Sequence, residues 1–293
     1  HIMNSLFYGC GTFVLLKGFD MDTVLASVLE NKVTRFYAVP TIYIRFLNNP
    51  ESKKYLKTLS YVFSAATSMP EEIVRQWHQE YRLAIHESYG MTESASITTF
   101  NHRYRHKVGA VGVPAGLSEI KLFNDQDKEI RPGETGEIVI RSPNIMKGYF
   151  NQPEETAHAL RSGWFHSGDV GRFDEEGYLY IVDRIKDVII SGGENIFPVE
   201  IEDFLHTLPG VKDIAAIGFP DERLGEVVTV IIDMVPGRTI TEEEVLKFCE
   251  KLPKYKRPKK IFFGEVPRNP TGKIEKPKLR KKYIGMEESF KIK

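Results

Sequence analysis

The sequence has few cysteines and no long apolar run. Cys10 and Cys249 are its only cysteines, and their separation gives no metal-site spacing, so we expect two small core residues in a reducing cytoplasm. No segment approaches the length of a membrane-spanning helix, and no basic stretch followed by an apolar one indicates a signal peptide. The sequence therefore predicts a cytoplasmic globular protein without a transmembrane segment.

The sequence also lacks net charge, but its charge is unevenly distributed. Residues 251–293 hold fifteen Lys or Arg and four Asp or Glu, a net charge of +11, and the remainder carries −11. A basic tail of this kind can bind nucleic acid, acidic lipid or a polyphosphate cofactor, or can be a solvated face. We expect no nucleic-acid binding, because the tail lacks interleaved aromatic residues for base stacking.

The 293 residues suffice for two domains, and we predict an α/β (multi-domain α+β) fold. Strand-like segments at 12–16, 34–39, 59–65 and 83–86 alternate with helical ones at 22–31, 40–47 and 70–80. This alternation predicts a parallel sheet covered by helices over residues 1–108. Ligands of such sheets lie beyond the carboxyl ends of the strands, so we expect chemistry in the segment after His86.

From residue 109 to 182 the pattern changes to short strands separated by turns. Glu119–Phe123 and Gly136–Arg141 are typical strands, and Asp174–Gly177 predicts a turn between two more. These features predict a small antiparallel or β-barrel-like subdomain. We assign residues 1–182 to one large domain.

A charged segment, DRIKD at 183–187, separates this region from a second α/β pattern. Pro198 and the apolar residues after it predict a helix, and Thr241 with Glu244 predicts a capping box. We expect a hinge at 183–187 and a mobile domain at 188–293. A solvated interdomain loop is the alternative for the charged segment.

The segment after the predicted strand at 83–86 reads ESYGMTE. Tyr89 could stack on a base, Thr92 could bond a phosphate oxygen, and Glu93 could help to hold Mg²⁺ that is carried by phosphates. A turn tyrosine and a helix cap would give the same residues, so this motif alone is weak.

Three further residues could bind a nucleotide. Asp169 in HSGDVG could accept both hydroxyls of a ribose, although turn aspartates that bond their own backbone are commoner. Arg184 could bond the same sugar, or could form a structural ion pair with Asp183 or Asp187. Lys273 in PTGK could reach a phosphate from a loop tip, although most loop lysines have no such role.

The order of these motifs is more specific than any one of them. The segments FSAATSMP, SYGMTES, GEIVIRSPNIMKGYF, GWFHSGDVG, DRIKDVIISGGENIFPVEIE and PRNPTGKI follow one another along the chain. Together they resemble the adenylate-forming superfamily of acyl- and aryl-CoA synthetases, peptide-synthetase adenylation domains and beetle luciferases. The resemblance covers nearly the whole chain and is nearest to an acyl-CoA ligase.

The resemblance implies a binding site for ATP and AMP. Glu87, Ser88 and Tyr89 would line the adenine, with Tyr89 stacked on it, Gly90 beside them and Ala66 on the other side. In the same comparison Thr92 would bond the α-phosphate and Glu93 would hold Mg²⁺, whereas Asp169 and Arg184 would bind the ribose.

The resemblance also implies roles in the smaller domain. Lys186 would be the pivot about which this domain rotates between two half-reactions. Lys273 would reach the α-phosphate and the carboxylate in the first, and Gly192 and Gly193 would line a tunnel for the pantetheine of coenzyme A in the second. Some relatives have a lysine near the nucleotide where this chain has Ile190, so that position implies no role.

The family's Ser/Thr/Gly-rich phosphate loop is not found in this sequence. We therefore expect a fragment that lacks the first part of the large domain and is inactive in adenylation by itself. The resemblance implies an acyl-CoA synthetase that joins a small-molecule carboxylic acid to CoA, as in fatty acid metabolism. A carrier-protein-loading adenylation domain and an incompetent nucleotide- or CoA-binding fragment stay open. The acid and the oligomeric state are not indicated, and peripheral membrane contact is expected only with a long-chain fatty acid.

Overall fold

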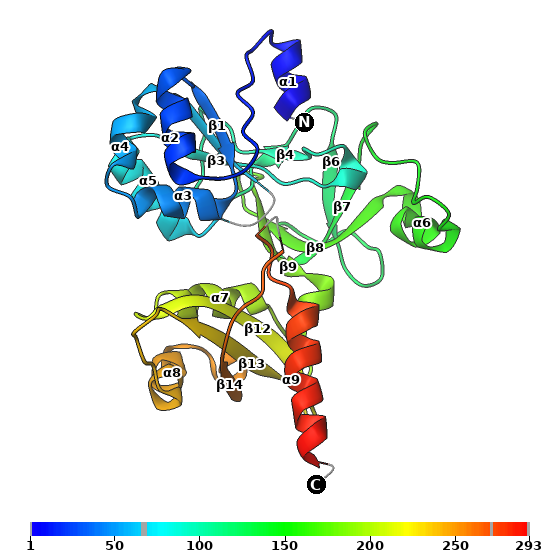
Figure 1. Cartoon of the computed structure of the whole chain (residues 1–293). Helices are drawn as coiled ribbons and strands as arrows, with labels where there is room; N and C mark the ends of the chain where they lie inside the picture. The colour runs from blue at the N-terminus through cyan, green and yellow to red at the C-terminus, as the bar shows by residue number, and fades with distance from the viewer. Residues whose placement is uncertain (1, 66–68, 270–271, 292–293) are drawn as a thin grey trace. The chain divides into compact units, whose positions relative to one another are not determined.

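A computed structural model describes residues 2–65, 69–269 and 272–291, and the side chains of these residues as far as Ile284 (Figure 1). The chain divides into two compact units. The first comprises residues 1–167 and 171–181, and the second comprises residues 168–170 and 182–293. Each unit is described separately. The domain and hinge boundaries drawn from the sequence stay predictions.

The first unit begins with a parallel sheet in the order β1-β2-β3, as predicted from the strand–helix alternation. The helices α2 to α5 are drawn around these strands in blue to cyan (Figure 1). The elements of this part are α1 (Ile2–Tyr8), α2 (Met21–Glu30), β1 (Arg35–Ala38), α3 (Pro40–Leu47), α4 (Ser52–Tyr55), η1 (Leu56–Thr58), β2 (Tyr61–Ser64), α5 (Glu71–Tyr81) and β3 (Ile85–Glu87).

An aromatic core holds these helices on the sheet. Tyr43, Phe46 and Trp77 are fully buried, and the Tyr43 hydroxyl donates to the Phe63 carbonyl at 2.8 Å. The helix α2 starts where the Asp20 carboxylate accepts from the Thr23 amide at 2.9 Å. The sheet is therefore rigid at the point where β3 delivers the motif at 87–93.

The β-rich part contains η2 (Thr92–Ser94), β4 (Thr99–Phe100), β5 (Val113–Pro114), β6 (Glu119–Phe123), β7 (Gly136–Arg141), α6 (Pro153–Ala159), η3 (Arg161–Gly163), β8 (Phe165–Phe173) and β9 (Leu179–Arg184). It belongs to the first unit except for residues 168–170 of β8 and 182–184 of β9, which belong to the second. The last four strands form an open sheet in the order β6-β7-β8-β9. The prediction of a β-barrel-like subdomain is therefore wrong in this detail. A sheet of four strands is too small to close into a barrel that has side chains packed inside it.

The second unit is built on a five-stranded sheet in the order β11-β10-β13-β12, with β14 parallel to β13. Its elements are η4 (Ile185–Asp187), β10 (Ile189–Ser191), β11 (Glu194–Ile196), α7 (Pro198–His206), β12 (Val211–Asp221), β13 (Gly225–Met234), α8 (Glu242–Phe248), η5 (Cys249–Lys251), η6 (Lys254–Lys256), β14 (Lys260–Phe263) and α9 (Lys276–Lys291). The predicted capping box is confirmed, because Thr241 and Glu244 bond each other's backbone amides at the start of α8. Figure 1 shows α9 in red beside β12, and the two elements are in contact.

One predicted element is absent. Residues 12–16 have no regular structure, although their apolar sequence favours a strand. Leu16 packs against the core of the first unit, but Phe13 and Leu15 remain exposed and, among the described residues, no strand pairs with this segment. Among the described residues, no helix has both the length and the apolar character needed to cross a bilayer.

Candidate nucleotide-binding site

The loop that follows β3 carries the first group of predicted site residues. Glu87 is the last residue of β3 and pairs in register with Ser64 of β2. Glu87 and Ser88 are buried, whereas Tyr89 is half-buried against the core of the β-rich part. The carbonyl of Tyr89 accepts from the amides of Thr98 and Thr99 at 2.9 and 3.0 Å. Backbone hydrogen bonds thus fix this loop beyond the carboxyl end of the strand.

Gly90 is required by the close approach of a second backbone segment. A Cβ atom at this position would lie 1.7 Å from the carbonyl oxygen of Ser96. Ala95 and Ser96, which form this return segment, both have positive φ, at 55° and 93°. The glycine therefore lets the chain fold back on itself around Thr92 and Glu93.

Glu87 is a buried acid with an unusual protonation equilibrium. Burial, opposed by a hydrogen bond with the Met69 backbone and reinforced by the nearby Glu71 charge, raises the pKa of Glu87 to about 8. Its Oε2 atom is buried without a hydrogen-bond partner among the described residues. At neutral pH this side chain is therefore mostly a neutral carboxylic acid, which can both donate and accept.

The carboxylate predicted to hold Mg²⁺ is supported by a tyrosine. Tyr149 donates its hydroxyl hydrogen to Glu93 Oε1 at 3.0 Å, and the Met146 amide donates to the Glu93 carbonyl at 2.8 Å. Burial raises the pKa of Tyr149, and the Glu93 carboxylate raises it further. Tyr149 therefore remains a hydrogen-bond donor that orients Glu93.

No cluster of three or more His, Cys, Asp or Glu side chains able to hold a metal lies in the described part of the chain. Mg²⁺ is usually bound through one or two carboxylates, substrate phosphates and water rather than by an all-protein cage. A single oriented carboxylate at Glu93 fits that donor set, provided that phosphates supply the remaining ligands.

A second group of predicted residues lies in the second unit. Arg184 Nε contacts Asp169 Oδ1 at 3.1 Å, and Asp169 is buried whereas Arg184 is partly exposed. The pairing differs from the alternative foreseen from the sequence, in which Arg184 pairs with Asp183 or Asp187. The two side chains predicted to bind a ribose therefore lie together.

The remaining predicted residues of this unit lie at turns. Lys186 is exposed within η4, and its carbonyl accepts from Arg280 at 3.5 Å. Gly192 and Gly193 form the β10–β11 turn with φ of 60° and 88°. A Cβ at Gly193 would meet nothing within 4 Å, so this backbone is open to close approach.

Lys273 is exposed on a short hairpin loop. The Lys273 amide donates to Asn269 Oδ1, and the Asn269 amide donates to the Lys273 carbonyl, both at 2.9 Å. Arg268 binds Asp213 through two contacts of 2.7 Å and also donates to the Gly272 carbonyl at 2.6 Å. These contacts hold the stem of the loop against β12. Burial would raise the pKa of Asp213, but hydrogen bonds from Arg268 and His206 leave it well below its usual range.

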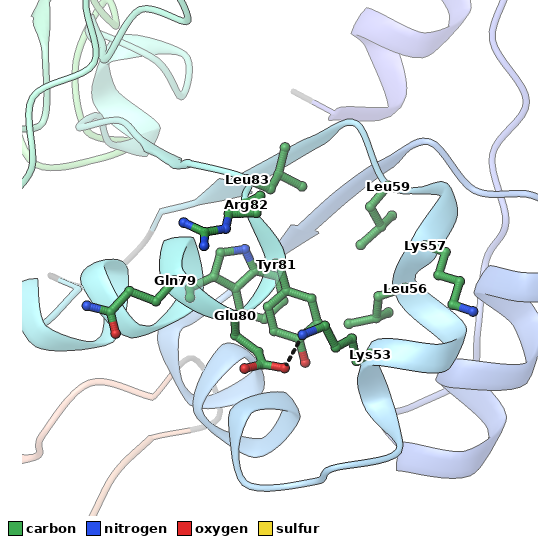
Figure 2. A pocket seen from close by; sticks show the side chains of 10 residues that line it. Lys53, Leu56, Lys57, Leu59, Gln79, Glu80, Tyr81, Arg82 and Leu83 are labelled. Atoms are coloured by element: carbon green, nitrogen blue, oxygen red, sulfur yellow. Dashed lines mark ion pairs between the residues drawn. The ribbon is translucent and has the colours of Figure 1, made fainter.

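The predicted residues therefore fall into two groups, at 87–93 in the first unit and at 169, 184–193 and 273 in the second. Ala66 lies outside the described residues. Tyr149 was missed, although it lies in a quoted motif, because no local pattern links it to a residue 56 positions earlier. A groove of about 390 Å³ beside Trp77 contains none of the predicted residues; it is lined by Lys53, Leu56, Lys57, Leu59, Trp77, Gln79, Glu80, Tyr81, Arg82 and Leu83 (Figure 2).

Comparison with known proteins gives consistent matches along the chain. Residues 1–150 match the model of the AMP-binding enzyme family, and residues 200–273 match that of the AMP-binding enzyme C-terminal domain. Feruloyl-CoA synthase from Amycolatopsis sp. is 38% identical over 93% of this chain and 56% of its own length. Long-chain-fatty-acid–CoA ligase FadD13 from Mycobacterium tuberculosis is 37% identical over 93% of this chain and 54% of its own length.

Solved structures match equally well. ATP-bound MatB from Rhodopseudomonas palustris has a TM-score of 0.92 at 34% identity, over 97% of this chain and 57% of MatB. The anthranilate CoA ligase AuaEII with anthranoyl-AMP has a TM-score of 0.83 at 30% identity, over 93% of this chain and 54% of AuaEII. The chain spans about half the length of the relatives it matches.

Proposed function

The chain belongs to the AMP-binding enzyme family, within the adenylate-forming superfamily, and from this premise we propose that it is the carboxyl-terminal part of an acyl-CoA synthetase. The proposal is supported by the names of its relatives, several of which are CoA ligases of aryl or fatty acids. The observation that carries it is the Asp169–Arg184 ion pair at 3.1 Å, which brings together a carboxylate and a guanidinium from two separate motifs, as a ribose site would need.

The reaction has two steps. A carboxylate oxygen of the acid attacks the α-phosphorus of ATP, the bond to the bridging oxygen breaks, and pyrophosphate leaves. The thiolate sulfur of CoA then attacks the acyl carbonyl carbon, and AMP leaves with the electrons of the acyl–oxygen bond. When Mg²⁺ is bound, it neutralises phosphate charge. The fold does not determine which acid is the substrate, so we assign only its class, a small carboxylic acid.

The residues of this chain have distinct parts in the first step. Tyr89 stacks on adenine, buried Glu87 lines the base, and Gly90 keeps this loop closed. Thr92 donates to an α-phosphate oxygen, while Glu93, held by Tyr149, provides the magnesium ligand. The backbone hydrogen bonds of the loop after β3 support these roles, because they hold the groups in place as a preorganised site requires.

The second unit supplies the mobile part of the mechanism. Lys273 neutralises the charge that develops at the α-phosphate during the first step. Rotation about Lys186 then withdraws Lys273 and presents the Gly192–Gly193 backbone to the pantetheine arm. A cytoplasmic location is a further expectation of the same proposal, and peripheral membrane contact is expected only if the acid is a long-chain fatty acid.

The test uses a completed enzyme, in which this chain follows the portion of Amycolatopsis feruloyl-CoA synthase that it does not match. We expect ferulate-dependent pyrophosphate release and formation of feruloyl-CoA. The Lys273→Ala variant should lose pyrophosphate release by about 100- to 1000-fold, as on removal of other preorganised charge-stabilising groups. Unchanged release would exclude this role for Lys273. Transfer of the acyl group to a carrier-protein thiol but not to CoA would show that the acceptor is a carrier protein.

A second measurement uses the 293-residue chain alone. Calorimetry with AMP and with ATP should give similar affinities, because the sequence contains no phosphate loop for the β- and γ-phosphates. An affinity for ATP more than about tenfold above that for AMP, a difference of about 1.4 kcal/mol, would contradict this expectation.

A further inference from the structure

The second unit contains three buried charged side chains that the mechanism above does not use. Asp183, Glu202 and Lys276 are 6%, 8% and 6% exposed. They come from β9, α7 and the first residue of α9, which are far apart in sequence. Buried charges are costly, and an apolar group of similar volume often does no harm in their place, so this cluster calls for a physical account.

Asp183 connects the strand that bears Arg184 to a helix. Its Oδ1 accepts from the Arg184 amide at 2.8 Å, and its Oδ2 accepts from the Val199 amide at 3.0 Å. The N-cap residue of α7, Phe197, has no side-chain cap, so Asp183 provides the missing acceptor from a distant strand. The position of Arg184 is thereby tied to the start of α7.

Glu202 and Lys276 connect the same helix to the loop of Lys273. Glu202 Oε1 accepts from Lys276 Nζ at 2.9 Å and from the Ala216 amide at 2.8 Å. Lys276 begins α9 only three residues after Lys273. The ion pair therefore fixes the carboxyl end of the Lys273 loop against α7 and β12.

The electrostatics join the two connections into one cluster. Burial raises the pKa of Asp183 and the Glu202 charge adds to this rise, whereas the Lys276 charge opposes it. One lysine thus stabilises two carboxylates in a low-dielectric surrounding. Loss of Lys276 would remove the cation that acts on Asp183 and the ion-pair partner of Glu202, which would keep only its weaker interaction with Arg268.

We propose that Asp183, Glu202 and Lys276 form a positioning network that holds Arg184 and the Lys273 loop in a fixed relation during adenylation. The network touches neither substrate nor reacting atoms and acts through the two residues that do. This inference rests on the proposed function, because it assigns those two residues to the ribose and the α-phosphate. Lys273 serves only the first step, whereas the ribose assigned to Arg184 is present in both steps. Loss of the network should therefore slow the first step much more than thioester formation.

The test separates the two half-reactions in the completed enzyme. For Lys276→Met we expect pyrophosphate release to fall by about 10- to 100-fold, as for a displacement of about 1 Å in a positioned group. Thioester formation from preformed feruloyl-adenylate and CoA should fall by less than about 3-fold on the same argument. Glu202→Gln should show the same asymmetry, and Lys276→Arg, which keeps the cation, should recover most of the first step.

The matched control is Lys278→Met, which removes an exposed lysine of the same helix that pairs with the half-buried Glu275 at 2.7 Å. Both half-reactions should be unchanged. If Lys276→Met fails to fold, Glu202→Asp shifts the pair while keeping both charges, and the same asymmetry is expected. An equal fall in both steps, or no fall in either, would overturn the network. An unsubstituted completed enzyme that forms no adenylate would instead reject the proposed function.

Discussion

The loop at 87–96 and the loop at 268–276 both present predicted site residues, but they are held by different forces. In the first, backbone amides and carbonyls bond each other and Gly90 permits a backbone approach. In the second, the stem depends on charged side chains, with Arg268 on Asp213 and Lys276 on Glu202. One loop is fixed by sterics and backbone bonding, the other largely by electrostatics.

This difference matches the work proposed for each loop. A loop that lines a base and a metal ligand benefits from a single rigid shape. A loop that must deliver and withdraw a lysine is better attached to its own unit by a few strong contacts at its stem, which leave Lys273 exposed. The comparison predicts that steric changes damage the first loop and charge changes damage the second.

The largest effect is expected at Gly90. Gly90→Ala forces a Cβ atom to within 1.7 Å of the Ser96 carbonyl, so we expect a loss of about 3 kcal/mol or more in the free energy of unfolding of the first unit. Trp77 and Trp164 both lie in this unit, so urea denaturation followed by tryptophan fluorescence reports it. Gly18→Ala, where a Cβ meets nothing within 4 Å, is the control and should change stability by less than about 0.5 kcal/mol.

The next effect concerns the charged loop. Arg268→Met leaves the Asp213 carboxylate poorly exposed and without its main partner, at a cost of about 2 kcal/mol to the second unit. Hydrogen exchange of β12 amides measures this loss. Asp213→Asn with Arg268→Met removes both charges and should recover part of the stability. A double variant no better than the single one would show that the pair contributes packing alone.

Glu87 makes the first loop sensitive to pH despite its backbone bonding. Its pKa is about 8 in the folded chain against 4.5 ordinarily, so the folded state holds a proton that the unfolded state releases. The contribution of Glu87 to the free energy of unfolding is therefore fully present below pH 4.5. It is lost as pH rises through about 8, and the free energy falls by up to about 1.4 kcal/mol per pH unit.

The glutamine in the Glu87→Gln variant is neutral at every pH. The difference in unfolding free energy between the variant and the unsubstituted chain therefore isolates the pH dependence that is due to Glu87. The subtraction cancels His86 and His106, whose pKa values are lowered mainly by burial. Equal slopes in the two proteins, measured by urea denaturation at pH 5.5 and 8.0, would show that Glu87 is charged when folded.

The smallest effect is expected for Lys278→Met. This residue is two-thirds exposed and its ion pair with Glu275 is solvated, so the change in stability should stay below about 0.5 kcal/mol. Hydrogen exchange of α9 measures it. A larger loss would mean that charge matters along the whole of α9 rather than only at its buried end.

The sequence predicted most regular elements because their local signals agree with their burial. The helix at Pro40–Leu47 and the strands at Glu119–Phe123 and Gly136–Arg141 have the bounds expected from proline, periodicity and turn residues. The strand expected at 12–16 failed since an apolar run forms a strand only beside a partner edge. The expected β-barrel-like form of the subdomain is wrong, because strand spacing does not reveal how many strands a sheet contains.

The candidate site was predicted unevenly for a similar reason. Motif order located Asp169 and Arg184, and the structure brings them into contact. Lys276 and Glu202 were overlooked because one lies in a lysine-rich stretch and the other in an ordinary amphipathic helix. Their pairing depends on tertiary structure, because α7 and α9 both contact β12, and no window of sequence contains that arrangement.

The remote cap that Asp183 gives to α7 bears on where this protein can be cut. A truncation starting at residue 188 would discard the acceptor of the Val199 amide and leave the first turn of that helix frayed. A piece starting at Val182 or earlier keeps it. Expression of the carboxyl-terminal part alone should therefore succeed only when the last residues of β9 are included.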